Sequence, residues 1–138
     1  MFWMKVLLLL DEVQFFMDNA VDNLESSRIL FDNEKYRNSI SLSYYAMYLT
    51  VKALLLSKGL VSKSHPGTIG LFYENFVETG LIDRDLHKCF ASTQTLREHA
   101  SYGAYDNYSR EKASSKIKCA EEMIAKSMTI LKMGIRQK

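Results

Sequence analysis

The fold of this chain is decided by the stretch SYYAMYLTVKALLL, which covers Ser43–Leu56. Apolar side chains recur in and just before this stretch at the spacing of one face of an α-helix. They are Ile40, Tyr44, Met47, Tyr48, Val51, Leu54 and Leu55. The pattern predicts a helix at the core of an all-α domain. A tyrosine can bury its ring while its hydroxyl keeps a polar partner, so Tyr44, Tyr45 and Tyr48 could also line a groove, but core packing is the favoured interpretation.

Helix period and turn residues predict about five helices in an up-and-down antiparallel bundle. The 138 residues are 47% hydrophobic with one proline, so we expect a single domain over residues 1–138. The expected helices are Asp11 to Phe31, Asn33 as cap to Lys58, Pro66 to Gly80, Asp83 as cap to Tyr102, and Ser109 to beyond Leu131. Residues 1–11 contain too short an apolar run for a signal peptide. We expect them to be an N-terminal extension of the first helix that packs on the bundle or on another subunit.

Three short motifs follow one another along the chain. The first is YYAMY-x-x-x-KALL within Ser43–Leu56, and a polar turn from Asn33 to Tyr36 precedes its helix. The second is an S-H-x-G turn at Ser64–Gly67, and the third is an R-x-x-A-[DS]-Y segment at Arg97–Tyr102. In these motifs the chain resembles the HEPN family of small prokaryotic helical proteins, over about residues 12 to 131.

The resemblance implies a helical bundle that is often encoded beside a minimal nucleotidyltransferase. Ribonuclease members of the family pair an arginine with a histidine roughly four to six residues later, and they cleave RNA without metal in a cleft between two subunits. In this chain Tyr102 stands in that region after Arg97. A tyrosine with a pKa of about 10 is a poor base at neutral pH, so the resemblance implies a protein without strong catalysis of its own.

The chain contains two cysteines, Cys89 and Cys119, which are far apart and belong to no C-x-x-C or Cys/His group. We expect buried free thiols rather than a disulfide or a zinc site, which fits a cytoplasmic protein. No metal or cofactor is expected, and no segment is expected to enter a membrane.

Charge is uneven along the chain. From Arg110 onward there are eight basic and three acidic residues, whereas the remainder has a net negative charge. A basic last helix could bind RNA or an acidic protein surface. A solvated face with lysines along its edge is the favoured interpretation.

The candidate site is centred on Arg97, whose forked donors suit a phosphate. We expect it to bind nucleotide or RNA together with Tyr102, Tyr44 and Tyr45. Further candidates are Ser101, His99 and His65. His65 is expected chiefly to cap or brace the turn at Pro66, and His99 lies nearly opposite Arg97 on a helical wheel.

Three functions are compatible with these residues. The favoured one, which rests on the resemblance, is the nucleotide- or RNA-binding partner of a minimal nucleotidyltransferase in a two-gene toxin–antitoxin-type module. The alternatives are a metal-independent endoribonuclease toxin that uses Arg97 with His99 or His65, and a structural adaptor between proteins. We also expect a homodimer with the two Arg97 side chains in a shared cleft, because many aromatic residues look exposed. They are Phe2, Trp3, Phe15, Tyr73, Tyr105 and Tyr108.

Overall fold

The structure is a computed structural model that describes residues 2–100 and 108–136. Within this part of the chain there are five α-helices, one π-helical turn and no strand. The elements are α1 (Phe2–Asp32), α2 (Tyr36–Ser57), α3 (His65–Phe72), which continues directly into η1 (Tyr73–Val77), α4 (Arg84–Ala100) and α5 (Arg110–Arg136). The predicted all-α fold is therefore confirmed.

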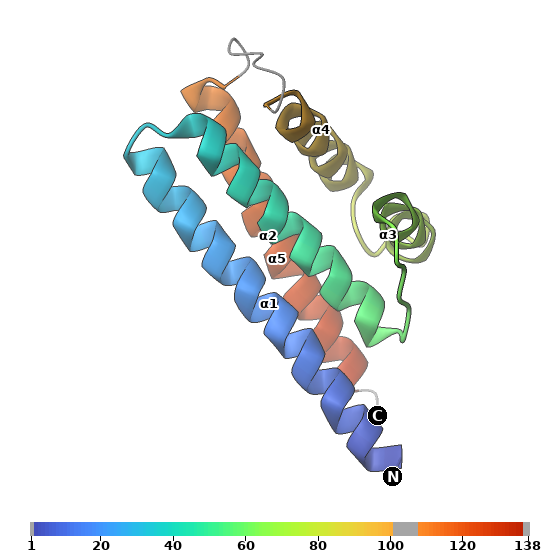
Figure 1. Cartoon of the computed structure of the whole chain (residues 1–138). Helices are drawn as coiled ribbons and strands as arrows, with labels where there is room; N and C mark the ends of the chain where they lie inside the picture. The colour runs from blue at the N-terminus through green and yellow to red at the C-terminus, as the bar shows by residue number, and fades with distance from the viewer. Residues whose placement is uncertain (1, 101–107, 137–138) are drawn as a thin grey trace.

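Three long helices, α1, α2 and α5, run alongside one another, with α2 and α5 in the same direction and α1 opposite to both, and α4 and α3 lie on the other side of α2 (Figure 1). Half of the 22 residues of α2 are buried, as the stripe in Ser43–Leu56 predicts. By length and composition α2 is apolar enough to cross a membrane, but 61% of its apolar window is buried inside the bundle. This burial is what a core helix requires.

Aromatic side chains fill the region where α2, α3 and α4 meet. The ring of Tyr44 stacks on Phe90 with centroids 5.4 Å apart, and Phe72 packs edge-on against Phe90 at 6.1 Å. All three rings are completely buried. Aromatic pairs in these geometries stabilise a core beyond the effect of their buried area, so this cluster fixes α4 against α2.

The first helix begins at Phe2, so the residues before Asp11 extend it, as expected. No glycine or proline interrupts the apolar run before Asp11, so the helix continues through residues that lie outside the predicted stripe. Its first turns carry exposed apolar side chains, which include Trp3, Met4, Leu7 and Leu8.

The predicted cap of the second helix is wrong. Asn33 ends the first helix instead, since its side-chain amide donates to the Ile29 carbonyl at 2.8 Å. The chain then turns through Glu34, which has a positive φ of 62°, and α2 follows Lys35 without a side-chain cap. Asparagine at a turn bonds readily to nearby backbone, and the sequence does not show in which direction it will do so.

Other predicted helix ends are confirmed. Gly59 and Gly80 have positive φ values of 71° and 84°, the left-handed conformation that glycine adopts without strain. The hydroxyl of Ser109 accepts a hydrogen bond from the Lys112 amide at 3.1 Å and so caps α5.

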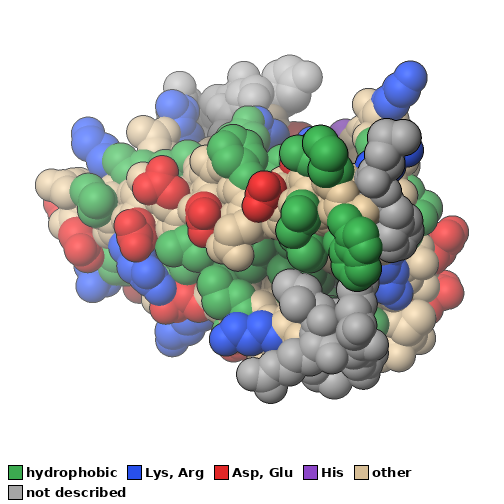
Figure 2. All heavy atoms as spheres, turned by 90° about the horizontal axis from the view of Figure 1, so that it is seen from below, with side chains coloured by type: hydrophobic (Ala, Val, Ile, Leu, Met, Phe, Trp, Pro, Cys, Tyr) green, Lys and Arg blue, Asp and Glu red, His purple; other side chains and the backbone are tan. Residues whose placement is uncertain are grey.

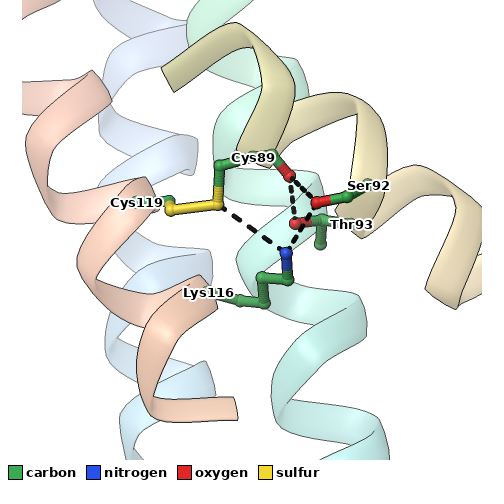
Figure 3. The surroundings of a disulfide bond; sticks show 5 residues. All are labelled: Cys89, Ser92, Thr93, Lys116 and Cys119. Atoms are coloured by element: carbon green, nitrogen blue, oxygen red, sulfur yellow. Dashed lines mark hydrogen bonds between the residues drawn. A yellow bond between two sulfur atoms is a disulfide. The ribbon is translucent and has the colours of Figure 1, made fainter. Parts of the chain in front are cut away.

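The cysteine prediction is wrong, because Cys89 of α4 and Cys119 of α5 form a disulfide (Figure 3). Their Cα atoms are 6.6 Å apart although 30 positions separate them in sequence. Each cysteine lies on the inward side of its own helix, and the sequence does not show that two such sides face each other at bonding distance.

Candidate functional site

Residues from three helices, α2, α3 and α4, meet in one place. Tyr44 and Tyr45 belong to α2, Arg97 to α4, and His65 is the first residue of α3. Hydrogen bonds and ring contacts link these four side chains, which we call the Arg97 cluster. All three sequence motifs therefore contribute to one place in the fold.

The guanidinium of Arg97 lies over two aromatic rings. Its Cζ is 4.4 Å from the ring centre of Tyr45 and 5.4 Å from that of Tyr44, both within the range of cation–π attraction. One terminal nitrogen also donates a hydrogen bond to the Tyr45 hydroxyl. Among the described side chains, no carboxylate forms an ion pair with Arg97. The cluster is thus a half-exposed cation on neutral rings, and its other N–H groups suit an anion such as phosphate.

Tyr44 connects the core with the cluster. Its ring is completely buried, and its hydroxyl lies 2.5 Å from Nε2 of His65. Burial raises the pKa of the Tyr44 hydroxyl far above its usual range, with a further contribution from Tyr48 and an opposing one from Arg97. Because Tyr44 keeps its proton, its hydroxyl can donate the hydrogen bond to Nε2 of His65.

His65 is held by the turn and by a second tyrosine. Its ring stacks on Tyr48 with centroids 4.5 Å apart. The helix cap is Ser64 and not His65, since the Ser64 hydroxyl accepts from the Gly67 amide at 3.0 Å. The expected bracing role of His65 is therefore observed, whereas the capping role belongs to its neighbour.

The glycine of the S-H-x-G turn has a steric function. A Cβ on Gly67 would lie 2.3 Å from the Ser62 hydroxyl oxygen and 2.7 Å from that of Ser64. These contacts are shorter than relaxed packing allows, so a side chain at position 67 would displace both serine hydroxyls, one of which caps the helix that begins at His65.

The structure brings together Arg97, Tyr44, Tyr45 and His65, and their part in ligand binding stays a prediction. Ser101, Tyr102 and the side chain of His99 lie outside the described residues. The sequence does not predict the hydrogen bond between Tyr44 and His65. The signal that pointed to it is that the two residues belong to two motifs of the same family.

The third histidine, His87, lies on α4 outside the three sequence motifs. Its ring packs against Tyr73 with centroids 5.1 Å apart and against Phe72 at 5.9 Å. Its Nδ1 is buried without a hydrogen-bond partner among the described residues, and burial lowers the pKa of the ring. His87 is thus a neutral packing residue set apart from the Arg97 cluster.

The depressed pKa of His87 predicts a loss of stability in acid. As pH falls below about 6.5, the unfolded chain protonates this histidine while the folded chain does not, so the unfolded state gains protons and stability falls. In a His87→Phe variant, which keeps an aromatic ring, this contribution disappears. Urea unfolding at pH 7.5, 6.5 and 5.5 should show a smaller loss between the first and last pH in the variant than in the parent. An equal loss in both proteins would contradict the prediction.

Among the described residues, no group of three His, Cys, Asp or Glu side chains could hold a metal ion. The Arg97 cluster itself consists of a cation, two tyrosine hydroxyls and an imidazole.

Comparison with protein families decides where the chain belongs. A model of the HEPN domain matches residues 13–131, which include all three motifs. The chain belongs to the HEPN family. The resemblance seen in the sequence is therefore confirmed, and the first turns of α1, before Val13, lie outside the matched domain.

Several relatives of this HEPN protein match over most of their length. A protein of Methanocaldococcus jannaschii named "Putative toxin" is 36% identical over 122 residues, which cover 88% of this chain and 90% of the relative. A UPF0332 protein of Gloeobacter violaceus is 32% identical over 124 residues, which cover 90% and 94% of the two chains.

Solved structures share the fold. An archaeal HEPN homologue matches with a TM-score of 0.71 at 21% identity and covers 86% of this chain and 97% of its own. A protein of Thermus thermophilus matches with a TM-score of 0.70 at 16% identity, with coverages of 85% and 96%. The helical bundle is therefore a HEPN bundle.

Proposed function

We propose that this HEPN protein binds the phosphate of a nucleotide or RNA at the Arg97 cluster and has no strong catalysis of its own. The observation that carries the proposal is the Arg97 guanidinium, which lies on two tyrosine rings without an ion-pair partner among the described residues. A cation held in this way has lost part of its rotamer freedom before the ligand arrives, so less entropy is lost on binding.

The tyrosines suit the rest of such a ligand. Tyr45 is 39% exposed, and its ring can stack on a nucleobase while its hydroxyl contacts ribose or phosphate. Tyr44 is buried, and its ring lies beneath the Arg97 guanidinium on the side of the core. Arg97 and Tyr45 together provide one cation and one aromatic surface, the combination that binds single-stranded nucleic acids.

The cellular role that we propose is a partner of a minimal nucleotidyltransferase in a two-gene toxin–antitoxin-type module in the cytoplasm. Membership of the HEPN family and the toxin name shared by two Methanocaldococcus jannaschii relatives support the module. Pairing with a nucleotidyltransferase rests on the sequence resemblance. Co-purification with a nucleotidyltransferase encoded by a neighbouring gene would test this role directly.

Arg97→Ala is expected to weaken binding by about 10- to 150-fold, which corresponds to about 1.5 to 3 kcal/mol for a lost charge-assisted contact. Binding would be followed by the fluorescence anisotropy of a labelled single-stranded RNA of mixed sequence and, separately, of labelled ATP. A response to only one probe would identify the ligand class.

The chain offers a matched control in Arg84. This arginine also lies on α4, with its Cζ 5.9 Å from the Tyr73 ring centre and a hydrogen bond of 2.8 Å to the Tyr73 hydroxyl. Arg84→Ala removes an equal charge from a similar contact outside the cluster, so it should leave affinity within about twofold of the parent. Equal losses in both variants would mean that only net charge matters, and the proposed site would be wrong.

A second candidate function is a metal-independent endoribonuclease. The observation in its favour is the hydrogen bond that links His65 to Tyr44 of the Arg97 cluster, because Nε2 of an imidazole can accept a proton from a ribose hydroxyl that takes the place of the Tyr44 hydroxyl. In that case the parent should cleave RNA in the presence of EDTA, whereas Arg97→Ala and His65→Asn should not. Such cleavage would replace the binding proposal, and intact RNA would remove this candidate.

We also propose a homodimer. Figure 2 shows hydrophobic side chains gathered on the face seen from below, with acidic ones among them. Trp3 is 73% exposed and Phe15 is 64% exposed, as the sequence predicted. Tyr73 and Tyr108 are instead half-buried, and their hydroxyls bond to Arg84 and to the Leu96 carbonyl. Phe2 and Tyr105 lie outside the described side chains.

Light scattering at high micromolar concentration would test this assembly. A monomer at that concentration would contradict the homodimer, and a dimer with the two Arg97 side chains far apart would contradict the shared cleft.

A further inference from the structure

The disulfide between α4 and α5 has a buried amine beside one of its sulfur atoms (Figure 3). Lys116 on α5 is only 9% exposed. Its Nζ donates to the Ser92 hydroxyl at 2.8 Å and lies 3.8 Å from Sγ of Cys89. Among the described side chains no carboxylate pairs with it. Burial, together with the charge of Lys112, lowers the pKa of Lys116.

The two redox states offer this amine different partners. A disulfide sulfur is a neutral and weak acceptor, so the oxidised protein leaves the ammonium poorly compensated. A thiolate at the same sulfur would form an ion pair with it. Lys116 therefore favours negative charge on Cys89, which makes Cys89 the better leaving group in thiol–disulfide exchange.

The two cysteines are both half-buried, but they differ in what lies beside them. Cys119 is half-buried and lines a surface hollow of about 530 Å³ on α5, together with Arg110, Lys118 and Glu122. Glu111 and Glu122 balance the charges of Arg110 and Lys118 in this hollow, so Cys119 is distinguished by access and not by charge. Cys89 does not line this hollow. The two sulfur atoms are thus distinguished, one by access and the other by a charged neighbour.

We propose that Cys119 is a thiol-exchange site for a dithiol reductant, and that the Cys89–Cys119 disulfide is a reversible switch that ties α4 to α5. In the first step a reductant thiolate forms a bond to Cys119 Sγ, the Cys89–Cys119 bond breaks, and Cys89 leaves as a thiolate beside Lys116. In the second step the other thiolate of the reductant forms the reductant's own disulfide and releases the Cys119 thiolate. Two electrons pass from the reductant to the protein, and the released thiolates take up protons according to pH.

Reduction would loosen α4, because the buried apolar residues of this helix are few. Leu86 and Phe90 are its buried hydrophobic side chains in the described structure, whereas half of α2 is buried. Arg97 lies on α4 beyond the disulfide, so reduction would also free the Arg97 cluster. The functional effect of reduction at the Arg97 cluster rests on the proposed function, but the thiol–disulfide exchange at Cys119 does not.

An experiment on the parent protein identifies which of the two sulfur atoms the incoming thiolate attacks. The oxidised full-length chain would be treated with excess glutathione for short times, quenched with iodoacetamide, digested and analysed by mass spectrometry. The expected product carries glutathione on Cys119 and the alkyl group on Cys89. The opposite distribution, or an even one, would overturn the proposed site.

The role of the amine is tested by reduction with dithiothreitol. Lys116→Met keeps an unbranched side chain and removes the charge, and it should slow reduction by about 3- to 10-fold, as expected when the leaving thiol becomes less acidic. Lys132→Met, an exposed lysine on the same helix, is the matched control and should reduce at the parent rate. An unchanged rate in Lys116→Met would contradict the role of the amine.

Hydrogen exchange tests the switch. On reduction of the parent, amides of residues 84–96 should exchange at least tenfold faster while those of α2 keep their protection. Equal exchange in the oxidised and reduced proteins would show that the disulfide does not control α4. None of these measurements uses RNA or nucleotide, so they remain decisive even if Arg97 binds neither.

Discussion

Tyr44→Ala is expected to lower the free energy of unfolding by about 3 to 5 kcal/mol, the usual cost of deleting a buried aromatic ring. The variant loses the stack on Phe90 and leaves a cavity in the region where α2 and α4 meet. It also leaves Nε2 of His65 without its partner. Urea unfolding followed by circular dichroism at pH 7.5 would measure the change.

The matched control is Tyr44→Phe, which keeps the ring and removes only the hydroxyl. Its cost should be about 0.5 to 1.5 kcal/mol, the usual contribution of one hydrogen bond. A Tyr44→Ala protein within about 1 kcal/mol of the parent would show that this ring does not support the core.

Removal of the disulfide has the second large expected effect. The double variant Cys89→Ala, Cys119→Ala should lose about 3 to 4 kcal/mol, because the crosslink closes a loop with a sequence separation of 30 and so restricts the unfolded chain. Urea unfolding of the oxidised parent and the variant would give the difference.

Dithiothreitol supplies the control for this prediction. It should lower the stability of the parent by a similar amount and leave that of the double variant unchanged. If the oxidised parent and the variant unfold at the same urea concentration with the same slope, the crosslink contributes nothing to stability.

The sequence predicts the helices well because their signals are local. The period of the stripe around Tyr44 identifies the core helix, and Gly59 and Gly80 end helices where their positive φ is needed. Each of these signals depends on residues within one or two turns. The same is true of Ser109, whose cap involves an amide three positions away.

The features that the sequence does not predict are of two kinds. They are contacts between distant segments, or positions where a side chain has two local hydrogen-bond partners available. The disulfide needs the distance between α4 and α5, and the contact of Tyr44 with His65 needs the placement of the turn on α2. Neither distance is encoded in a periodic pattern. At Asn33 the side chain had two local partners available, the helix before it and the helix after it, and it bonds to the former.

Tyr44 has a consequence for how this protein can change over evolutionary time. Its ring belongs to the core, and its hydroxyl belongs to the Arg97 cluster. Most substitutions there would reduce the amount of folded protein before any new ligand preference could be selected. Tyr45 and Arg97 are more exposed, so under the proposed function variation at these two positions would alter ligand recognition at constant abundance. A deep substitution scan should therefore show abundance and binding falling together at position 44 and separately at positions 45 and 97.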